Sequence, residues 1–194
     1  MYLIVLISIA IHSCYIGSKV VVSLLALELG ASQFLIGNIA ALYALLPLLL
    51  GVYSGRLADT IGMRVPMLIG AIFTTLAMLC GFAWQQLPAL FATAMLMGAA
   101  FVFYNVSIQN LTGAYGRPEQ RAHNFSMLTI GYSVSSFIGP MIAGFSIDYA
   151  GHARAFLIFA LLTLFPIAVL TFYPRVTQVQ TLKSEKQERR TLDL

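Results

Sequence analysis

A row of polar side chains runs through the first, otherwise apolar, stretch of the chain. Its members recur at steps of four and three, which places them on one face of a helix. They are Ser8, His12, Tyr15, Lys19 and Ser23. Hydroxyl, imidazole and ammonium groups on one face can form hydrogen bonds and carry charge in apolar surroundings. The pattern therefore indicates the lining of a polar cavity.

Lys19 allows two interpretations, and so does His12. Lys19 is the only charged residue well inside a predicted membrane-spanning stretch. A charge there is costly, so a functional role that favours anionic groups on a ligand is one interpretation. The other is that its long side chain reaches the outer membrane interface near Glu28. His12 is either a hydrogen-bonded packing residue or a proton carrier.

A second polar face lies in the fourth apolar stretch. It carries Asn105, Gln109 and Thr112 at helical spacing. We expect this face to meet the first one. The predicted cavity lining consists of His12, Tyr15, Lys19, Asn105 and Gln109.

The pattern lacks the groups that an enzyme would need. His12, His123 and His152 lie in separate segments, and no nucleophile–base pair, paired carboxylates or metal-ligand cluster is evident. Cys14 and Cys80 sit in apolar stretches, which indicates neither a disulfide framework nor a metal site. The sequence predicts no enzymatic activity, no cofactor and no metal. Nucleic-acid binding is not expected either, because the basic residues near the C-terminus alternate with acids and suit a membrane surface better.

Helices that cross a lipid bilayer must position these residues. Of the 194 residues, 59% are hydrophobic and only 9% are charged, against about 25% charged residues in soluble domains. Long unbroken apolar runs favour crossing helices over barrel strands. Six helices are predicted, over residues 2–27, 33–54, 66–84, 88–111, 123–147 and 154–173. The fold class is an all-α membrane protein, with one six-helix bundle over residues 1–173.

The basic residues predict the orientation of this bundle. Nine of the eleven lysines and arginines fall on one side of the predicted membrane: Arg56, Arg64, Arg117, Arg121, Arg175, Lys183, Lys186, Arg189 and Arg190. The positive-inside rule makes that side cytoplasmic. We therefore expect a multi-pass protein of the cell membrane with both termini in the cytoplasm. Residues 174–194 form a polar cytoplasmic tail.

Two predicted loops share a pattern of residue types. A glycine, an aspartate and a second glycine recur at an offset of 89 residues, and an arginine follows each second glycine. The residues are Gly55, Asp59, Gly62 and Arg64 in one loop, and Gly144, Asp148, Gly151 and Arg154 in the other. An odd number of helices separates the loops, so they lie on opposite sides of the membrane. This pattern is typical of the three-plus-three inverted repeat of secondary transporters.

The first of these loops carries a longer motif. It consists of Gly55, Leu57, Ala58, Asp59 and Gly62, with Arg64 as a basic residue. The loop resembles the signature between helices 2 and 3 of the Major Facilitator Superfamily. The resemblance implies that the chain is the N-terminal six-helix half of a twelve-helix transporter fold. It also implies that this loop latches the two halves together in one state. Asp59 can accept backbone hydrogen bonds at a helix start and pair with Arg64. The alternative is a tight turn in which Asp59 is only an N-cap residue.

A second motif lies in the fifth predicted helix. Gly139, Pro140 and Gly144 resemble a motif of the antiporter branches of that superfamily, which favours drug-efflux-type antiport. A helix kink with close packing and no link to antiport is the alternative. No Asp or Glu lies inside the six predicted helices. Proton antiport would then depend on His12 or on groups elsewhere.

The resemblance implies transport of a small solute by alternating access. The expected partners are the lipid bilayer, a small-molecule substrate and a second six-helix half. That half is either part of the same longer protein or a second copy of this chain. The alternative is a truncated half-protein that inserts into the membrane but only regulates, or does not transport at all.

Overall fold

The computed structural model describes residues 1–174. The predicted tail over residues 174–194 therefore lies, apart from Pro174, outside the described residues. Five of the nine basic residues that predict the orientation fall in that same tail.

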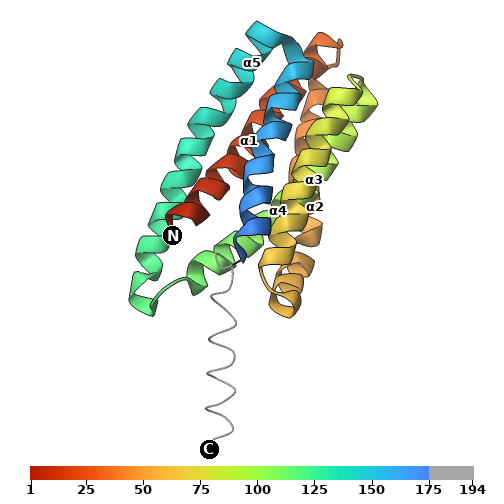
Figure 1. Ribbon diagram of the computed structural model, residues 1–194. Coiled ribbons are helices and arrows are strands. Elements are labelled where there is room, and N and C mark those ends of the chain that lie inside the picture. The colour runs from red at the N-terminus through yellow and green to blue at the C-terminus, as the bar shows by residue number, and fades with distance from the viewer. Residues whose placement is uncertain (175–194) are drawn as a thin grey trace, which may run out of the picture.

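The described chain is a bundle of long helices without strands (Figure 1). The helices are α1 (Tyr2–Glu28), α2 (Gln33–Ile61), α3 (Arg64–Ala83), α4 (Leu87–Ala114) and α5 (Arg121–Phe172), with a short 3-10 turn, η1 (Pro118–Gln120), before α5. Within residues 1–174, these five helices are long and apolar enough to cross a membrane. The all-helical prediction is confirmed, and α2 and α4 run further than the sequence predicts.

The helix α5 reverses direction at a single glycine. Gly151 has φ 81° and ψ 168°, a backbone conformation outside the helical region, in the middle of 52 residues assigned to one helix. Figure 1 shows α5 rising along α1 and descending again beyond the bend. We call residues 121–150 the first arm and residues 152–172 the second arm. The two arms correspond to the fifth and sixth predicted helices.

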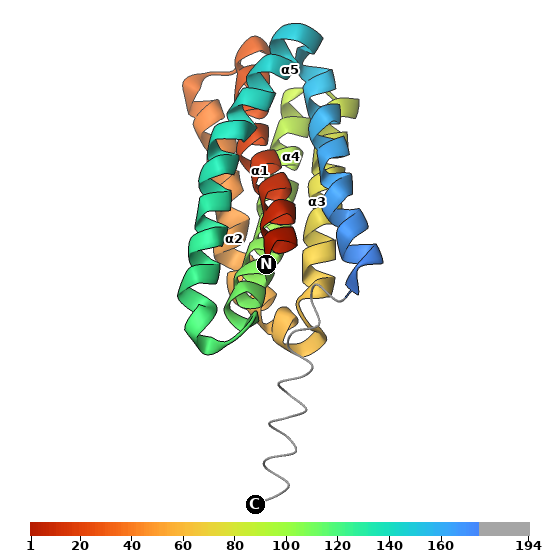
Figure 2. The same ribbon diagram turned by 60° about the vertical axis from the view of Figure 1, so that its left-hand side comes forward.

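Successive helices connect at alternating ends of the bundle (Figure 2). The α1–α2 and α3–α4 turns and the bend of α5 lie at one end, and the α2–α3 and α4–α5 connections lie at the other. The second arm ends toward the end that holds the α2–α3 turn, whereas α1 begins part-way along the bundle. Consecutive segments therefore run in opposite directions along the bundle.

The helix α1 lies inside the bundle, whereas α2 lies at its margin. In an apolar 18-residue stretch of α1, 67% is buried, against 11% in the corresponding stretch of α2. The helix α1 packs mainly on α5, and α4 packs on both α2 and α3. The α1–α5 contact is close because Gly139 lies against the backbone of Ser13 and Gly17. The α2–α4 contact is close because Gly98 faces the carbonyl oxygens of Leu42 and Tyr43.

Candidate functional site

The polar faces of α1 and α4 meet at a pair of stacked rings. Tyr15 of α1 and Phe101 of α4 have ring centroids 3.8 Å apart and an interplanar angle of 11°. Their neighbours on the same two helices are His12, Lys19 and Asn105, within one turn on either side. The stack therefore marks the centre of the candidate site. We call His12, Tyr15, Lys19, Tyr43, Phe101, Asn105 and Tyr132 the aromatic cluster.

On one side of the stack, His12 lies on the ring of Tyr132 from the first arm of α5. The two ring centroids are 4.5 Å apart in a stacked arrangement. The Tyr132 hydroxyl donates a hydrogen bond of 2.9 Å to Oδ1 of Asn105. Nδ1 of His12 is buried and has no hydrogen-bond partner within residues 1–174.

On the other side of the stack, Lys19 lies over two tyrosine rings. Its Nζ is 4.2 Å from the ring centroid of Tyr15 and 5.5 Å from that of Tyr43 on α2. These distances fall within the range of cation–π contacts. A charge placed inside the bilayer costs about 2.5–3.5 kcal/mol on insertion scales. The ring faces offset part of that cost.

The structure brings together four of the five residues predicted to line a cavity. Gln109 is exposed and lies outside the aromatic cluster. Residue spacing alone does not single out the aromatic members Tyr43, Phe101 and Tyr132, because aromatic residues in apolar helices are usually packing residues. One signal was available for Phe101, which precedes Asn105 by one helical turn and thus lies on the same face.

The α2–α3 loop differs from its predicted geometry. Asp59 is exposed in the last turn of α2 and, within residues 1–174, forms no ion pair. The side chain of Arg64 instead donates from Nε to the carbonyl oxygen of Leu170 at 2.8 Å. It also donates from Nη2 to the carbonyl oxygen of Thr171 at 2.9 Å. The predicted Asp59–Arg64 contact is therefore wrong for this state, because helix-end carbonyls of the second arm occupy the guanidinium.

The remaining residues of this loop motif lie around the same turn. Gly62 ends α2 with φ 81° and ψ 165°, which turns the chain into α3. Leu57 is half-buried. No described atom lies within 4 Å of the position that a Cβ on Gly55 would take. Within residues 1–174, Gly55 therefore makes no close helix contact.

The second loop of the pattern is the bend of α5. Asp148 and Arg154 are exposed on either side of Gly151. The next residue, His152, contacts Glu28 at the end of α1, with Nδ1 2.9 Å from Oε2. The carboxylate nearest to Lys19 along α1 thus already has a partner.

The fifth-helix motif divides between a packed side and an open side. A Cβ on Gly139 would lie 2.6 Å from the carbonyl oxygen of Ser13, so only glycine fits against α1 without a shift. Gly144 has no described atom within 4 Å of a Cβ position. Pro140 is half-buried, and the helical dihedrals of α5 continue through it.

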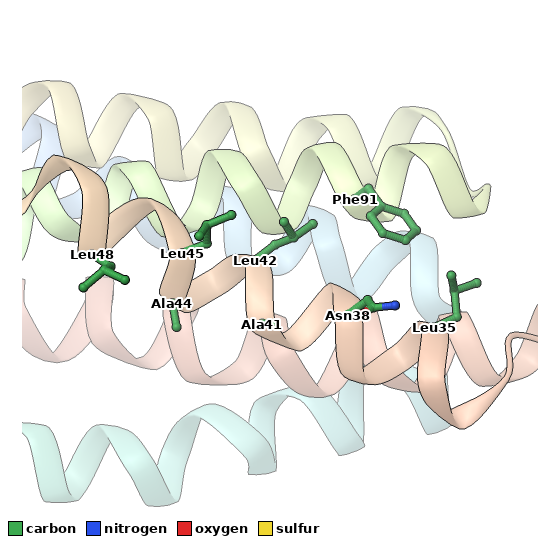
Figure 3. A pocket seen from close by; sticks show the side chains of 8 residues that line it. All are labelled: Leu35, Asn38, Ala41, Leu42, Ala44, Leu45, Leu48 and Phe91. Carbon is green, nitrogen blue, oxygen red and sulfur yellow. The ribbon is translucent and has the colours of Figure 1, made fainter.

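An apolar groove runs along the exposed face of α2 (Figure 3). It has a volume of about 710 Å³, and Asn38 is its one polar side chain. The lining residues are Leu35, Asn38, Ala41, Leu42, Ala44, Leu45 and Leu48 of α2, and Phe91 of α4. A lining so apolar suits a packing surface better than a polar solute.

Comparison with known sequences identifies the family. The sequence model of the Major Facilitator Superfamily matches residues 2–194. The chain belongs to the Major Facilitator Superfamily. The superfamily and the long apolar helices together make it a multi-pass membrane protein.

Curated relatives in this superfamily include vesicular acetylcholine transporters. The human protein of that name is 29% identical over 137 residues, which cover 70% of this chain and 26% of the relative. The protein of Torpedo marmorata is 27% identical over 156 residues, which cover 76% of this chain and 30% of the relative. The chain thus matches less than a third of the length of either relative.

A solved structure shares the fold. A mutant of the peptide transporter POT, crystallised in complex with sulfate, superposes with a TM-score of 0.81 at 18% identity. The match covers 91% of this chain and 38% of that chain. At this identity the likeness shows the superfamily fold alone.

Proposed function

We propose that this chain is one six-helix half of a superfamily transporter, which moves a small solute by alternating access. One observation carries the proposal: side chains of α1, α2, α4 and α5 converge on the aromatic cluster inside a membrane-spanning bundle. Solute sites of such transporters lie near the membrane midplane, between repeated helices. A transport protein without enzymatic activity fits this arrangement.

The backbone supports six crossings related by a three-plus-three inverted repeat. Gly62 and Gly151, at the offset of 89 residues, have nearly the same φ and ψ values. Gly30 and Gly116, at an offset of 86, also share a positive φ. The three residues of η1 lie between Gly116 and Gly151, and they account for the difference of three between the two offsets. A two-fold axis would relate each pair.

The stacked rings give the repeat a centre. Tyr15 and Phe101 are also 86 residues apart, so they are equivalent positions of the two three-helix repeats. Equivalent residues can touch only where a two-fold axis passes between them. Their contact at 3.8 Å is what this symmetry predicts for helices α1 and α4.

The open face of α2 supports a missing second half. Gly37, Gly51 and Gly55 have no described atom within 4 Å of a Cβ position, so room is left for another helix to pack closely. The apolar groove lies on the same helix. We propose that a second six-helix half covers this face, either from the same longer protein or as a second copy. The bundle over residues 1–173 would then be one domain, with the tail over residues 174–194 as the start of a central loop.

Acetylcholine, the substrate in the names of the relatives, does not carry over easily. It is a quaternary ammonium ion, and the ammonium of Lys19 would repel it inside a low-dielectric site.

We propose a cell-membrane location with both termini in the cytoplasm, on the strength of the basic residues. For the fifth-helix motif we favour the packing role over drug-efflux antiport, because Gly139 lies directly against α1.

The substitution Asp59→Asn tests this function. Asp59 is exposed and unpaired within residues 1–174, so its carboxylate is available to a second half. Loss of one charge-assisted contact should lower the transport rate roughly ten-fold while insertion is unchanged. Solute uptake is measured in vesicles that hold the chain and its second half. The amount of inserted protein is measured as the fraction that stays with the membrane pellet after extraction.

Glu119→Gln is the matched control, since Glu119 is an exposed acid in η1 at the same end of the bundle. Unchanged uptake in Asp59→Asn would remove the latch role. Vesicles that hold only residues 1–194 test the alternative function. No uptake with either preparation would favour the non-transporting half-protein.

A further inference from the structure

The ammonium of Lys19 is held by two rings that are themselves fixed. Tyr15 is stacked on Phe101, and Tyr43 is 2% exposed. The Tyr43 hydroxyl donates to Oγ of Ser18 at 3.3 Å, and the Ser18 hydroxyl donates to the Tyr15 carbonyl oxygen at 2.8 Å. The walls around the charge are therefore rigid, which favours a preformed binding site over a mobile surface lysine.

The direction of the Lys19 side chain excludes an interfacial role in this state. Its amine lies over Tyr15, which is one helical turn nearer to the N-terminus of α1. The side chain thus points toward the centre of the bundle rather than toward Glu28. Nine residues separate Lys19 from Glu28, about 14 Å along the helix, and Glu28 already pairs with His152.

The charge of Lys19 has no counterion in the described chain. Within residues 1–174, no carboxylate or hydrogen-bond acceptor contacts Nζ, which meets only the faces of Tyr15 and Tyr43. Ring faces leave N–H donors of an ammonium unused, because a cation–π contact is not a hydrogen bond. The site is thus incomplete in charge and in hydrogen bonding, and an anion would supply both.

We infer that Lys19, with Tyr15 and Tyr43, binds the anionic group of the transported solute, a carboxylate or a phosphate. The inference rests on the proposed transport function, since it names the class of solute. Charge-assisted hydrogen bonds from Nζ would hold the anion. The opposite side of the Tyr15–Phe101 stack, with His12 and Asn105, is left for the polar remainder of the solute.

Equilibrium binding of two labelled anions, benzoate and inorganic phosphate, tests this site. The protein is purified with its second half and placed in phosphatidylcholine vesicles, with choline as a cationic probe. We expect binding of at least one anion and not of choline. Lys19→Gln should weaken anion binding roughly ten- to hundred-fold, the equivalent of one charge-assisted hydrogen bond.

Two control variants define the effect. Lys19→Arg keeps the charge and should keep most of the affinity, while Arg121→Gln removes an exposed cation at the start of α5 and should change nothing. Equal anion affinity in wild type and Lys19→Gln would overturn the inference. So would a wild-type protein that binds neither anion, or that prefers choline.

A second measurement does not depend on the folding of a variant. Acetylation of Lys19 in the wild-type protein is followed by mass spectrometry with and without the anions. Protection of Lys19 by benzoate or phosphate supports the site, and equal labelling overturns it. Vesicles with added phosphatidylglycerol separate a solute from a lipid headgroup: full competition by that lipid would assign the anion to the bilayer and overturn the solute assignment.

Uptake assays on the same vesicles keep the two proposals apart. If solute uptake is observed but Lys19→Gln leaves anion binding unchanged, the anion site is refuted and the transport function stands. Lys19-dependent anion binding without uptake of any solute would refute transport and leave the site intact.

Discussion

Arg64 ties together two helix ends that are far apart in the sequence. It begins α3, and its guanidinium binds the carbonyl oxygens of Leu170 and Thr171 in the last turn of α5. The last carbonyls of a helix have no partner within the helix and carry partial negative charge. A residue that sequence motifs assign to a loop therefore also acts as a helix cap.

We expect Arg64→Met to destabilise the bundle by about 1–3 kcal/mol, since two hydrogen bonds from a charged donor are lost. The measurement is the Tm of thermal unfolding in detergent. Arg56→Met serves as the control, because Arg56 is an exposed arginine of α2 whose guanidinium forms no hydrogen bond or ion pair within residues 1–174. If both variants unfold at the same temperature, the cap has no energetic role.

At the scale of elements, glycines decide which helices come close. The same helix α5 has Gly139 against α1 and Gly144 facing open space. Small residues permit close packing in lipid, where no hydrophobic effect drives helices together. The two positions therefore differ: Gly139 packs against α1, and Gly144 has no close neighbour within residues 1–174.

Gly139→Ala should lower the stability of the bundle by about 1–3 kcal/mol, because the new methyl group meets the Ser13 carbonyl and forces α1 and α5 apart. Gly144→Ala should leave the Tm of the isolated chain unchanged or slightly higher, since alanine favours a helix. Thermal unfolding of the two variants is compared side by side. An equal drop for both would contradict the close α1–α5 contact.

On the scale of the whole molecule, two glycines reverse the chain in the same way at opposite ends. Gly62 and Gly151 both combine φ 81° with ψ between 165° and 168°. That region is essentially accessible to glycine alone. The shared conformation is the backbone counterpart of the repeated Gly–Asp–Gly pattern in the sequence.

Gly62→Ala and Gly151→Ala should each destabilise the bundle, by about 1–3 kcal/mol. If the two three-helix segments of this bundle are related as an inverted repeat, the two losses of stability should be similar. The Tm values are compared with that of Gly37→Ala, a helical glycine with free space around it. A loss confined to one of the two bends would argue against equivalent roles.

The sequence alone determined the membrane setting, the helices and the family. These depend on long apolar runs and on local glycine and proline signals, which are properties of short segments. Helical periodicity, which fixes the face of each helix, is also why four of the five residues predicted to line a cavity lie near one another. Gln109 has the same helical spacing, but it is exposed and lies outside the aromatic cluster.

Only the tertiary structure decided which partners these residues take. Arg64 binds carbonyl groups more than a hundred residues away instead of its neighbour Asp59. The Lys19 amine lies over Tyr15 and Tyr43 instead of reaching for Glu28, which pairs with His152. Such choices depend on the distances between helices, which no local pattern encodes. Residue spacing specifies the face on which a side chain lies, and the packing of the helices specifies what it meets there.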